Sequence, residues 1–231
     1  MSIQAIVTDI EGTTTDIGFV HRVLFPYAAR QLPAYIAAHR DEPRVQALLA
    51  EVAAQSGRPG ASEAQVVDQL LEWIKLDLKI TPLKTLQGWI WREGYERGDF
   101  TGHLYPDAAI CLRRWHEAGL RLYVYSSGSE EAQRLLFGHS DHGDLTGLFS
   151  GFFDTRVGAK READSYRHIA RAIDLPPGRI LFLSDIESEL DAARTAGLET
   201  CLLARAAGLT SSHPVAADFH HIPQLQALSC R

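Results

Sequence analysis

Polar side chains close or follow three separate apolar runs of this sequence. The runs, at 3–8, 120–127 and 179–185, are short and bounded by turn-forming residues, which is typical of buried strands. In an open parallel sheet the ligand site lies outside the carboxyl ends of the strands, so we expect the polar residues at these three points to share one crevice. They are Asp9, Glu11, Ser126, Ser127, Gly128, Asp185 and Glu187.

These residue types would support phosphoryl transfer. Asp9 can act as a nucleophile that forms an aspartyl-phosphate, and Glu11 can protonate the leaving oxygen and later activate water. Mg²⁺ takes one or two carboxylates together with phosphate and water, and Asp9 and Asp185 could supply those carboxylates. The metal would neutralise charge on the phosphoryl oxygens and so allow two anions to approach each other.

Two further motifs could hold the phosphate group. Ser126, Ser127 and Gly128 precede a predicted helix, and hydroxyl and backbone N–H groups at such a helix start can bind phosphate oxygens. Lys160, in the segment VGAKREADSY, would supply a fixed positive charge that stabilises the transition state.

Each of these motifs, taken singly, has a plainer interpretation. Asp9 and Asp185 could cap loop turns. Ser129 could be the N-cap of a strand-to-helix turn, and Lys160 could be a solvated lysine at a helix start. The occurrence of all the motifs in one ordered α/β unit favours the active site over these separate explanations.

Two groups of conspicuous residues are expected to be structural. The carboxylates Glu187, Glu189 and Asp191 open a predicted helix, where negative charge favours the positive end of the helix dipole, apart from a possible support of the metal. Aromatic residues at helical spacings are expected to form a core rather than a ligand site. They are Trp73, Trp89, Trp91 and Tyr95.

The elements around the candidate site alternate between helix and strand, except in one block. Residues 19–97 repeat apolar positions three and four apart, which predicts helices only. After residue 105, helices of about 10–15 residues separate short strands, which predicts a parallel sheet covered on both faces. We therefore expect an α/β fold, a Rossmann-like core from 1–16 and 101–231 with a helical cap inserted at 17–100.

Composition excludes several classes of protein. The chain has 231 residues, 45% of them hydrophobic and 23% charged, which is ordinary for a packed globular protein. A net charge of −6 gives no cationic excess, so nucleic acid is not an expected partner. Cys111, Cys201 and Cys230 form no CxxC pair, which fits a reducing compartment. Neither a signal peptide nor an apolar run of about 18 residues is present, so we expect a cytoplasmic protein without a membrane partner.

The motif order Asp-x-Glu-Gly-Thr-Thr, Ser-Ser-Gly, Lys, Ser-Asp-x-x-x-Glu-Leu-Asp resembles the haloacid dehalogenase superfamily of phosphatases. More narrowly, it resembles the enolase-phosphatase (acireductone synthase) family of methionine salvage. The superfamily usually carries Asp two residues after the nucleophile, and Glu11 is the narrower family's variant. Segments at 19–28, 87–98, 102–107, 125–129 and 182–193 are also similar, so the resemblance covers nearly the whole chain.

The resemblance implies a bifunctional reaction on 2,3-diketo-5-methylthiopentyl 1-phosphate. Enolisation gives an enediol phosphate, and dephosphorylation then gives the acireductone 1,2-dihydroxy-3-keto-5-methylthiopentene. One Mg²⁺ per subunit and a monomer are typical of the family. The implied residue roles are Asp9 as nucleophile and metal ligand, Glu11 as acid/base and metal ligand, Asp185 as metal ligand, and Ser126, Ser127, Gly128 and Lys160 as phosphate-binding residues.

The resemblance does not decide which residue removes the C1 proton. Glu11 or a residue of the cap could be the base, with His21 and Tyr95 as candidates. A cap would shield the enediol from bulk water between the two steps. Phe19, Val20 and Trp91 are expected to contact the methylthio-alkyl tail of the substrate, because they are apolar residues of the predicted insertion.

Three alternatives remain open at this point. A phosphatase of the same fold could hydrolyse another small phosphate without enolisation. A metal-free relative could displace halide from haloacids with the same aspartate, although Glu11 and Asp185 argue against it. Lastly, the chain could bind a phosphate ligand without catalysis.

Overall fold

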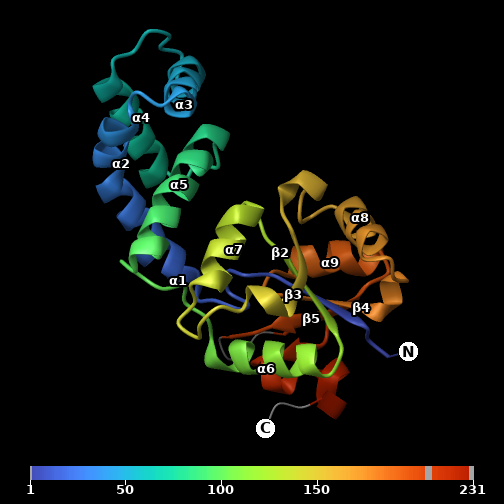
Figure 1. The fold of residues 1–231 in the computed structure, drawn as a ribbon. Coiled ribbons are helices and arrows are strands. Elements are labelled where there is room, and N and C mark those ends of the chain that lie inside the picture. The colour runs from blue at the N-terminus through green and yellow to red at the C-terminus, as the bar shows by residue number, and fades with distance from the viewer. Residues whose placement is uncertain (1, 206–209, 229–231) are drawn as a thin grey trace. The chain divides into compact units, whose positions relative to one another are not determined.

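The structure is a computed structural model that describes residues 2–205 and 210–228 (Figure 1). Its elements divide into two compact units, one formed by Met1–Ile17 with Thr101–Arg231 and the other by Gly18–Phe100. Each unit is described by itself below. The role of the second unit as a cap stays a prediction.

The first unit is built on a parallel sheet with six strands in the described residues, in the order β3-β2-β1-β4-β5-β6. Strand β1 therefore lies in the middle, with Thr8 beside Val124 of β2 on one side and beside Leu183 of β4 on the other. The predicted α/β fold with a Rossmann-like parallel sheet is confirmed. The strand bounds are β1 Ala5–Thr8, β2 Arg121–Tyr125, β3 Phe149–Phe153, β4 Ile180–Ser184, β5 Glu199–Leu203 and β6 Val215–Ala216.

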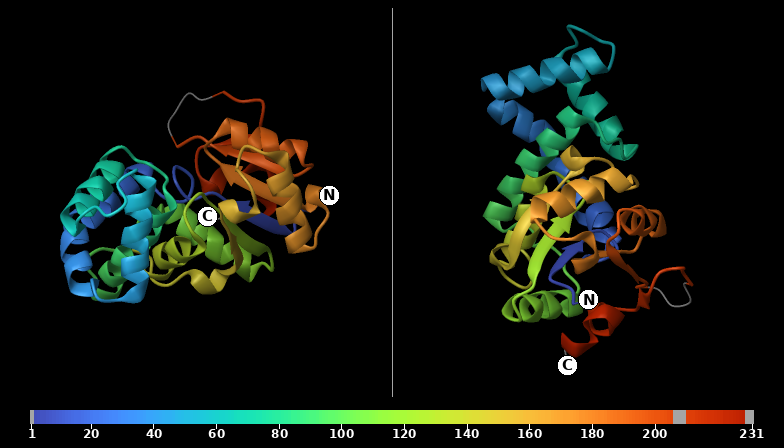
Figure 2. Two further views of the ribbon diagram at one scale, coloured as in Figure 1. Left: turned by 90° about the horizontal axis from the view of Figure 1, so that it is seen from above. Right: turned by 90° about the vertical axis from the view of Figure 1, so that its right-hand side faces the viewer.

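Helices cover both faces of this sheet, as Figures 1 and 2 show. Helices α8 and α9 pack on one face, where their apolar side chains join those of alternate strand residues such as Val7 and Phe182 in one buried cluster. Helix α6 lies on the other face, with Trp115 stacked on Phe219. All four residues of β1 are buried, as expected for a central strand between two helical layers. The helix bounds are α6 Pro106–Glu117, α7 Glu130–Gly138, α8 Ala163–Ile173 and α9 Glu187–Thr195.

The second unit is entirely helical. Its helices enclose a cluster of buried side chains that includes Leu32, Val52, Leu70 and Leu86. Helix α4 begins with a capping box in which Ser62 and Gln65 bond each other's backbone N–H groups, so Ser62 is the N-cap of this helix. The bounds are α1 Ile17–Phe19, a π-helical turn Val20–Leu24, α2 Phe25–His39, α3 Pro43–Gln55, α4 Glu63–Lys75 and α5 Thr81–Arg97.

The last part of the chain adds a feature that the sequence did not predict. The short strand β6 pairs with β5, and Phe219, Ile222 and Leu225 are buried. This last segment is therefore packed against the rest of the first unit. A two-residue strand carries too little periodicity to be recognised from sequence.

Cys111 and Cys201 are buried free thiols, and Cys230 lies outside the described residues. Among the described residues, no helix has the length and apolar character needed to span a membrane.

Candidate active site

A buried lysine joins two carboxylates at the carboxyl edge of the sheet. Asp9 follows β1, Glu189 lies in the first turn of α9, and Lys160 lies in the loop between β3 and α8. The Lys160 Nζ atom is 2.6 Å from Asp9 Oδ1 and 2.7 Å from Glu189 Oε2. The three side chains are only 11%, 6% and 10% exposed in the order Lys160, Asp9, Glu189. The structure thus brings together two of the predicted catalytic residues.

The charges of this cluster stabilise one another. Burial by itself would lower the pKa of Lys160, but the neighbouring charges of Asp9 and Glu189 raise it, so the lysine stays protonated. Burial, followed by the charge of Asp9, raises the pKa of Glu189, and Lys160 opposes that rise. Because a buried charge is costly without a partner, each carboxylate depends on the single ammonium group between them.

Two donors fix the orientation of the Asp9 carboxylate. The backbone N–H of Ile10 donates to Oδ1 over 2.8 Å, and Lys160 binds the same oxygen. Both donors therefore act on Oδ1, which leaves Oδ2 as the oxygen that can attack an electrophile. The side chain lies at the end of a fully buried strand, so its position is set by the sheet rather than by a flexible loop.

Asp185 carries a buried carboxylate oxygen without a donor. It follows β4, and its Oδ1 atom finds no hydrogen-bond partner among the described residues. Burial, followed by the negative charge of Asp9, raises its pKa to about 6. A cation would stabilise a buried carboxylate oxygen that lacks a donor and feels the negative charge of a second carboxylate. The donor set therefore fits Mg²⁺, which needs only one or two carboxylates from the protein. No group of three or more His, Cys, Asp or Glu side chains suited to a metal occurs in the described part of the chain.

The loop that carries Glu11 is tightly wound and lies against Asp185. The Ile10 carbonyl accepts the N–H groups of Thr13, Thr14 and Thr15, and Gly12 donates back to the Thr15 carbonyl. Gly12 has a φ of 76°, and a Cβ atom at this position would stand 2.1 Å from Asp185 Oδ2. Glycine is therefore required twice over, for its backbone angle and for the close approach of the acid. Glu11 lies half-buried on this loop.

Arg205, which was not recognised from the sequence, binds the same loop. It follows strand β5. Its Nη2 and Nε atoms donate to the Thr13 carbonyl over 2.7 and 3.2 Å, and its Nη1 atom donates to Asp107 over 2.7 Å. The guanidinium group also lies 4.0 Å from the ring centre of Tyr105. A lone arginine after a strand gives no sequence signal that its partner is a backbone carbonyl almost 200 residues away.

The predicted phosphate-binding segment follows β2, the strand next to β1. Ser126 is buried and its Oγ accepts the Gly128 N–H over 3.2 Å, whereas Ser127 is exposed. Ser129 caps α7 by accepting the Ala132 N–H, so the helix start expected after this segment is present. Thr8 pairs with Val124 in parallel strands, so Asp9 is level with Tyr125. Ser126 therefore lies one residue further toward the carboxyl edge of the sheet than Asp9. The sheet register thus places this segment at the same edge as Asp9.

Gln133 is a second residue that the sequence analysis missed. From α7, its Nε2 atom donates to the carbonyls of Gly128 and Phe153, both over 2.9 Å, and so ties the segment after β2 to the end of β3. The side chain is 1% exposed. Glutamine on a helix is common, so its type alone does not reveal this contact.

The structure corrects the interpretation of Glu189. Glu189 was expected to stabilise the helix start, apart from a support of the metal, but its carboxylate binds Lys160 and accepts the Ser184 hydroxyl over 3.0 Å. Glu189 lies four residues after Asp185, in the first turn of α9, and this position brings its side chain close to the carboxyl ends of the strands. Glu187 and Asp191 do have structural contacts, since they bind Ser211 and Arg194 respectively.

The cap residues named from the sequence lie in the second unit. His21 packs edge-on against Phe25, and Trp91 donates its indole N–H to the Leu24 carbonyl over 2.9 Å. Burial raises the pKa of the Tyr95 hydroxyl, which disfavours this residue as a base. Contacts of Phe19, Val20 and Trp91 with a substrate tail stay predictions.

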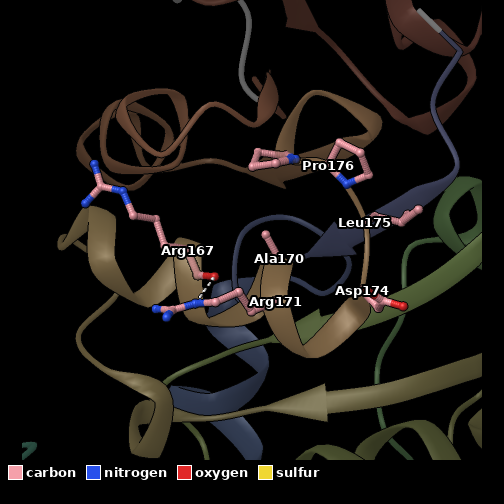
Figure 3. Close-up of a pocket in the computed structure, with 7 residues that line it drawn as sticks. Arg167, Ala170, Arg171, Asp174, Leu175 and Pro176 are labelled. Atoms are coloured by element: carbon pink, nitrogen blue, oxygen red, sulfur yellow. Dashed lines mark hydrogen bonds between the residues drawn. The ribbon is translucent and has the colours of Figure 1, made fainter.

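A separate pocket of about 580 Å³ lies away from the candidate site (Figure 3). It is formed by the end of α8 and the turn that leads into the amino end of β4, opposite to the edge that carries Asp9 and Asp185. Arg171 donates there to the Arg167 carbonyl. The lining residues are Arg167, Ala170, Arg171, Asp174, Leu175, Pro176 and Pro177.

Comparison with known proteins defines the class and then the family. The family model for haloacid dehalogenase-like hydrolase matches residues 3–197. The chain is 58% identical over 221 residues to Enolase-phosphatase E1 of Alcanivorax borkumensis, a match that covers 95% of this chain and 98% of that protein. The structure of the UTR4 protein of Saccharomyces cerevisiae is 34% identical with a TM-score of 0.80, and the match covers 94% of this chain and 99% of that one.

More distant structures share the fold alone. The L-2-haloacid dehalogenase of Xanthobacter autotrophicus is 20% identical with a TM-score of 0.57, over 97% of this chain and 98% of that one. The fold and the family-model match are those of haloacid dehalogenase-like hydrolases. Within this class the chain belongs to the enolase-phosphatase family, as its motifs predicted, and it is a phosphatase enzyme.

The contact of Gly12 with Asp185 yields a prediction for the cation site. Gly12→Ala should displace the Asp185 carboxylate and raise the Mg²⁺ concentration for half-maximal thermal stabilisation at least about tenfold, because a Cβ atom would overlap Oδ2. Gly119→Ala is the matched control, since Gly119 has a similar φ of 85° but nothing within 4 Å of an added Cβ. Both variants should lose about 1–2 kcal/mol from backbone strain, and only the first should change the Mg²⁺ response. Equal Mg²⁺ responses would contradict the assignment of Asp185 to the cation.

Proposed function

We propose that this enzyme converts 2,3-diketo-5-methylthiopentyl 1-phosphate to the acireductone 1,2-dihydroxy-3-keto-5-methylthiopentene and phosphate, in methionine salvage. The observation that carries the proposal is the pairing of Asp9 with Lys160 close to Asp185, whose buried Oδ1 atom has no donor among the described residues. The 58% identity to a protein named Enolase-phosphatase E1 supports the substrate and the pairing of two activities. One Mg²⁺ per subunit, a monomer and a cytoplasmic location belong to the same proposal.

Asp9 and Asp185 would hold the Mg²⁺ ion, and Glu11 is added as a ligand on the family resemblance alone, since the described residues hold no group of three such side chains suited to a metal. When bound, the ion supplies positive charge that neutralises the phosphoryl oxygens and stabilises an enolate oxygen. The support for this assignment is the buried Asp185 oxygen without a donor and the carboxylate of Asp9 that faces it.

In the phosphatase step, Asp9 Oδ2 attacks phosphorus and the bond from phosphorus to the C1 oxygen breaks. Glu11 gives its proton to the leaving oxygen, so the acireductone departs as an alcohol. Glu11 then takes a proton from water, which attacks the aspartyl-phosphate and releases inorganic phosphate and free Asp9. Lys160, with Ser126, Ser127 and Gly128, would bind the phosphoryl oxygens through both stages.

In the enolisation step, a base removes one C1 proton of the diketone and the C2 oxygen gains a proton. The adjacent ketone acidifies the C1 position, so a carboxylate is a sufficient base. Glu11 is the candidate on the described loop, and His21 is the candidate from the helical unit. Tyr95 is less suitable, because burial raises the pKa of its hydroxyl and keeps it protonated.

Two of the rival functions are disfavoured by particular observations. Halide displacement by a metal-free relative leaves the donor-free oxygen of Asp185 unexplained, and the likeness to haloacid dehalogenases at 20% identity concerns the fold alone. A non-catalytic binding protein does not need an aspartate whose Oδ1 is bound by two donors while Oδ2 is left to attack.

Removal of the nucleophile tests the phosphatase step. Asp9→Asn should lower the rate of phosphate release by at least about 10³, because an amide oxygen cannot form the aspartyl-phosphate. Asp144→Asn is the control, since Asp144 is an exposed aspartate that binds Thr146 in its own turn. Phosphate release would be followed with the diketone phosphate. An Asp9→Asn variant that keeps the wild-type rate would overturn the assignment of the nucleophile.

Deuterium exchange separates enolisation from dephosphorylation. In D₂O, the Asp9→Asn variant should still form the enol phosphate, seen by its absorbance, and return substrate that carries deuterium at C1. The reason is that proton removal from C1 does not need attack on phosphorus. Wild-type enzyme should show the same exchange before phosphate appears. Phosphate release without any C1 exchange would instead favour a phosphatase that does not enolise its substrate.

Chelation tests the metal requirement. Treatment with EDTA should abolish phosphate release from the diketone phosphate, and added Mg²⁺ should restore it, because two adjacent carboxylates repel an incoming phosphate in the absence of a cation. Addition of the Mg²⁺–EDTA complex is the control for the chelator itself. Turnover that is insensitive to the chelator would favour the halide-displacing alternative.

A further inference from the structure

Three consecutive backbone carbonyls of the Lys160 loop each accept a side-chain hydroxyl. Tyr125 donates to the Gly158 carbonyl over 3.0 Å, and Ser165 donates to the Ala159 carbonyl over 2.7 Å. Tyr166 donates to the carbonyl of Lys160 itself, also over 2.7 Å. None of these contacts is part of a helix or a sheet ladder, so they hold a segment that lacks regular structure.

The three donors come from rigid parts of the first unit. Tyr125 is the last residue of β2, and Ser165 and Tyr166 lie in the first turn of α8. All three are at most 1% exposed, and the two tyrosine rings meet edge-to-face with centres 5.5 Å apart. Burial raises the pKa of both tyrosines, so their hydroxyls remain protonated and can donate.

Gly158 lets the loop lie directly on these donors. Its φ of 133° belongs to a region that essentially only glycine adopts. An added Cβ atom would stand 2.2 Å from Ser165 Oγ, so the backbone and the serine are in immediate contact. The loop is therefore shaped to place its carbonyls on the hydroxyls, at the cost of accepting only glycine at this position.

We propose that Tyr125, Ser165 and Tyr166 are positioning residues that hold the backbone of Lys160 so that its ammonium group stands ready for the phosphoryl group. The inference rests on the proposed function and deepens it. A lysine side chain has four rotatable bonds, so a fixed main chain is needed before a short contact with Asp9 can be held. A charge placed in advance costs no reorganisation when the transition state forms.

A purely structural role is the competing explanation, because buried hydroxyls need partners wherever they occur. The two explanations differ in what Lys160 does. If the hydroxyls act through Lys160, their removal must weaken phosphate binding only while the lysine is present. If they merely stabilise the fold, their removal must have the same effect with or without it.

Single-hydroxyl deletions provide the test. Tyr166→Phe, Tyr125→Phe and Ser165→Ala should each lower turnover of the diketone phosphate about tenfold and weaken binding of inorganic phosphate, measured by calorimetry with Mg²⁺, about fivefold to tenfold. Tyr123→Phe is the matched control, because Tyr123 lies on the same strand as Tyr125 and its ring stacks on Phe153. This control should change both quantities less than twofold.

The decisive measurement is a double-mutant cycle in phosphate binding. In a Lys160→Met background, Tyr166→Phe should have no further effect on phosphate affinity. Effects that add in full, or single variants that bind phosphate as the wild type does, would overturn the proposal. Should Tyr166→Phe not fold, Ser165→Ala completes the same cycle.

This cycle is independent of the proposed reaction. It uses inorganic phosphate as the probe and does not require turnover. An enzyme that fails to convert the diketone phosphate would disprove the substrate, while the cycle would still decide whether the hydroxyls act through Lys160. If Lys160→Met leaves phosphate affinity unchanged, the positioning role is overturned whatever the substrate is.

Discussion

One buried ammonium group connects the parts of the chain that make the site. Lys160 binds Asp9 at the end of β1 and Glu189 at the start of α9, and the loop that carries it is held by α8 and β2. Because removal of one partner from a buried ion pair costs about 3–5 kcal/mol, these segments cannot move independently. The sheet, the helix starts and the lysine loop are therefore one rigid support for the chemistry.

The strand-end residues could be predicted because two simple signals coincide in them. Short apolar runs mark strands, and the carboxyl edge of a parallel sheet gathers whatever follows them, so Asp9, Ser126 and Asp185 were placed at one edge. Lys160 follows a less regular segment and was recognised by its order among the motifs. The family was identified in the same way, from the order and spacing of the motifs rather than from any one of them.

The supporting residues could not be predicted in this way. Arg205, Gln133 and Tyr166 act on backbone carbonyls, which every residue has, so no pattern of side chains reveals the partner. Glu189 was misread because a carboxylate in a first helical turn has a sufficient local explanation in the helix dipole. The local explanation failed because a long-range ion pair outweighs it, and that pair exists only in the folded chain.

The central place of β1 sets the order in which this enzyme can be completed on the ribosome. Both of its neighbours are synthesised after it, and one of them, β4, ends only at residue 184. The helical unit at 18–100 is continuous in the chain and is translated in between. The nascent chain must therefore carry an apolar strand with an unpaired edge until β4 has been made, and such an edge is prone to pair with other chains.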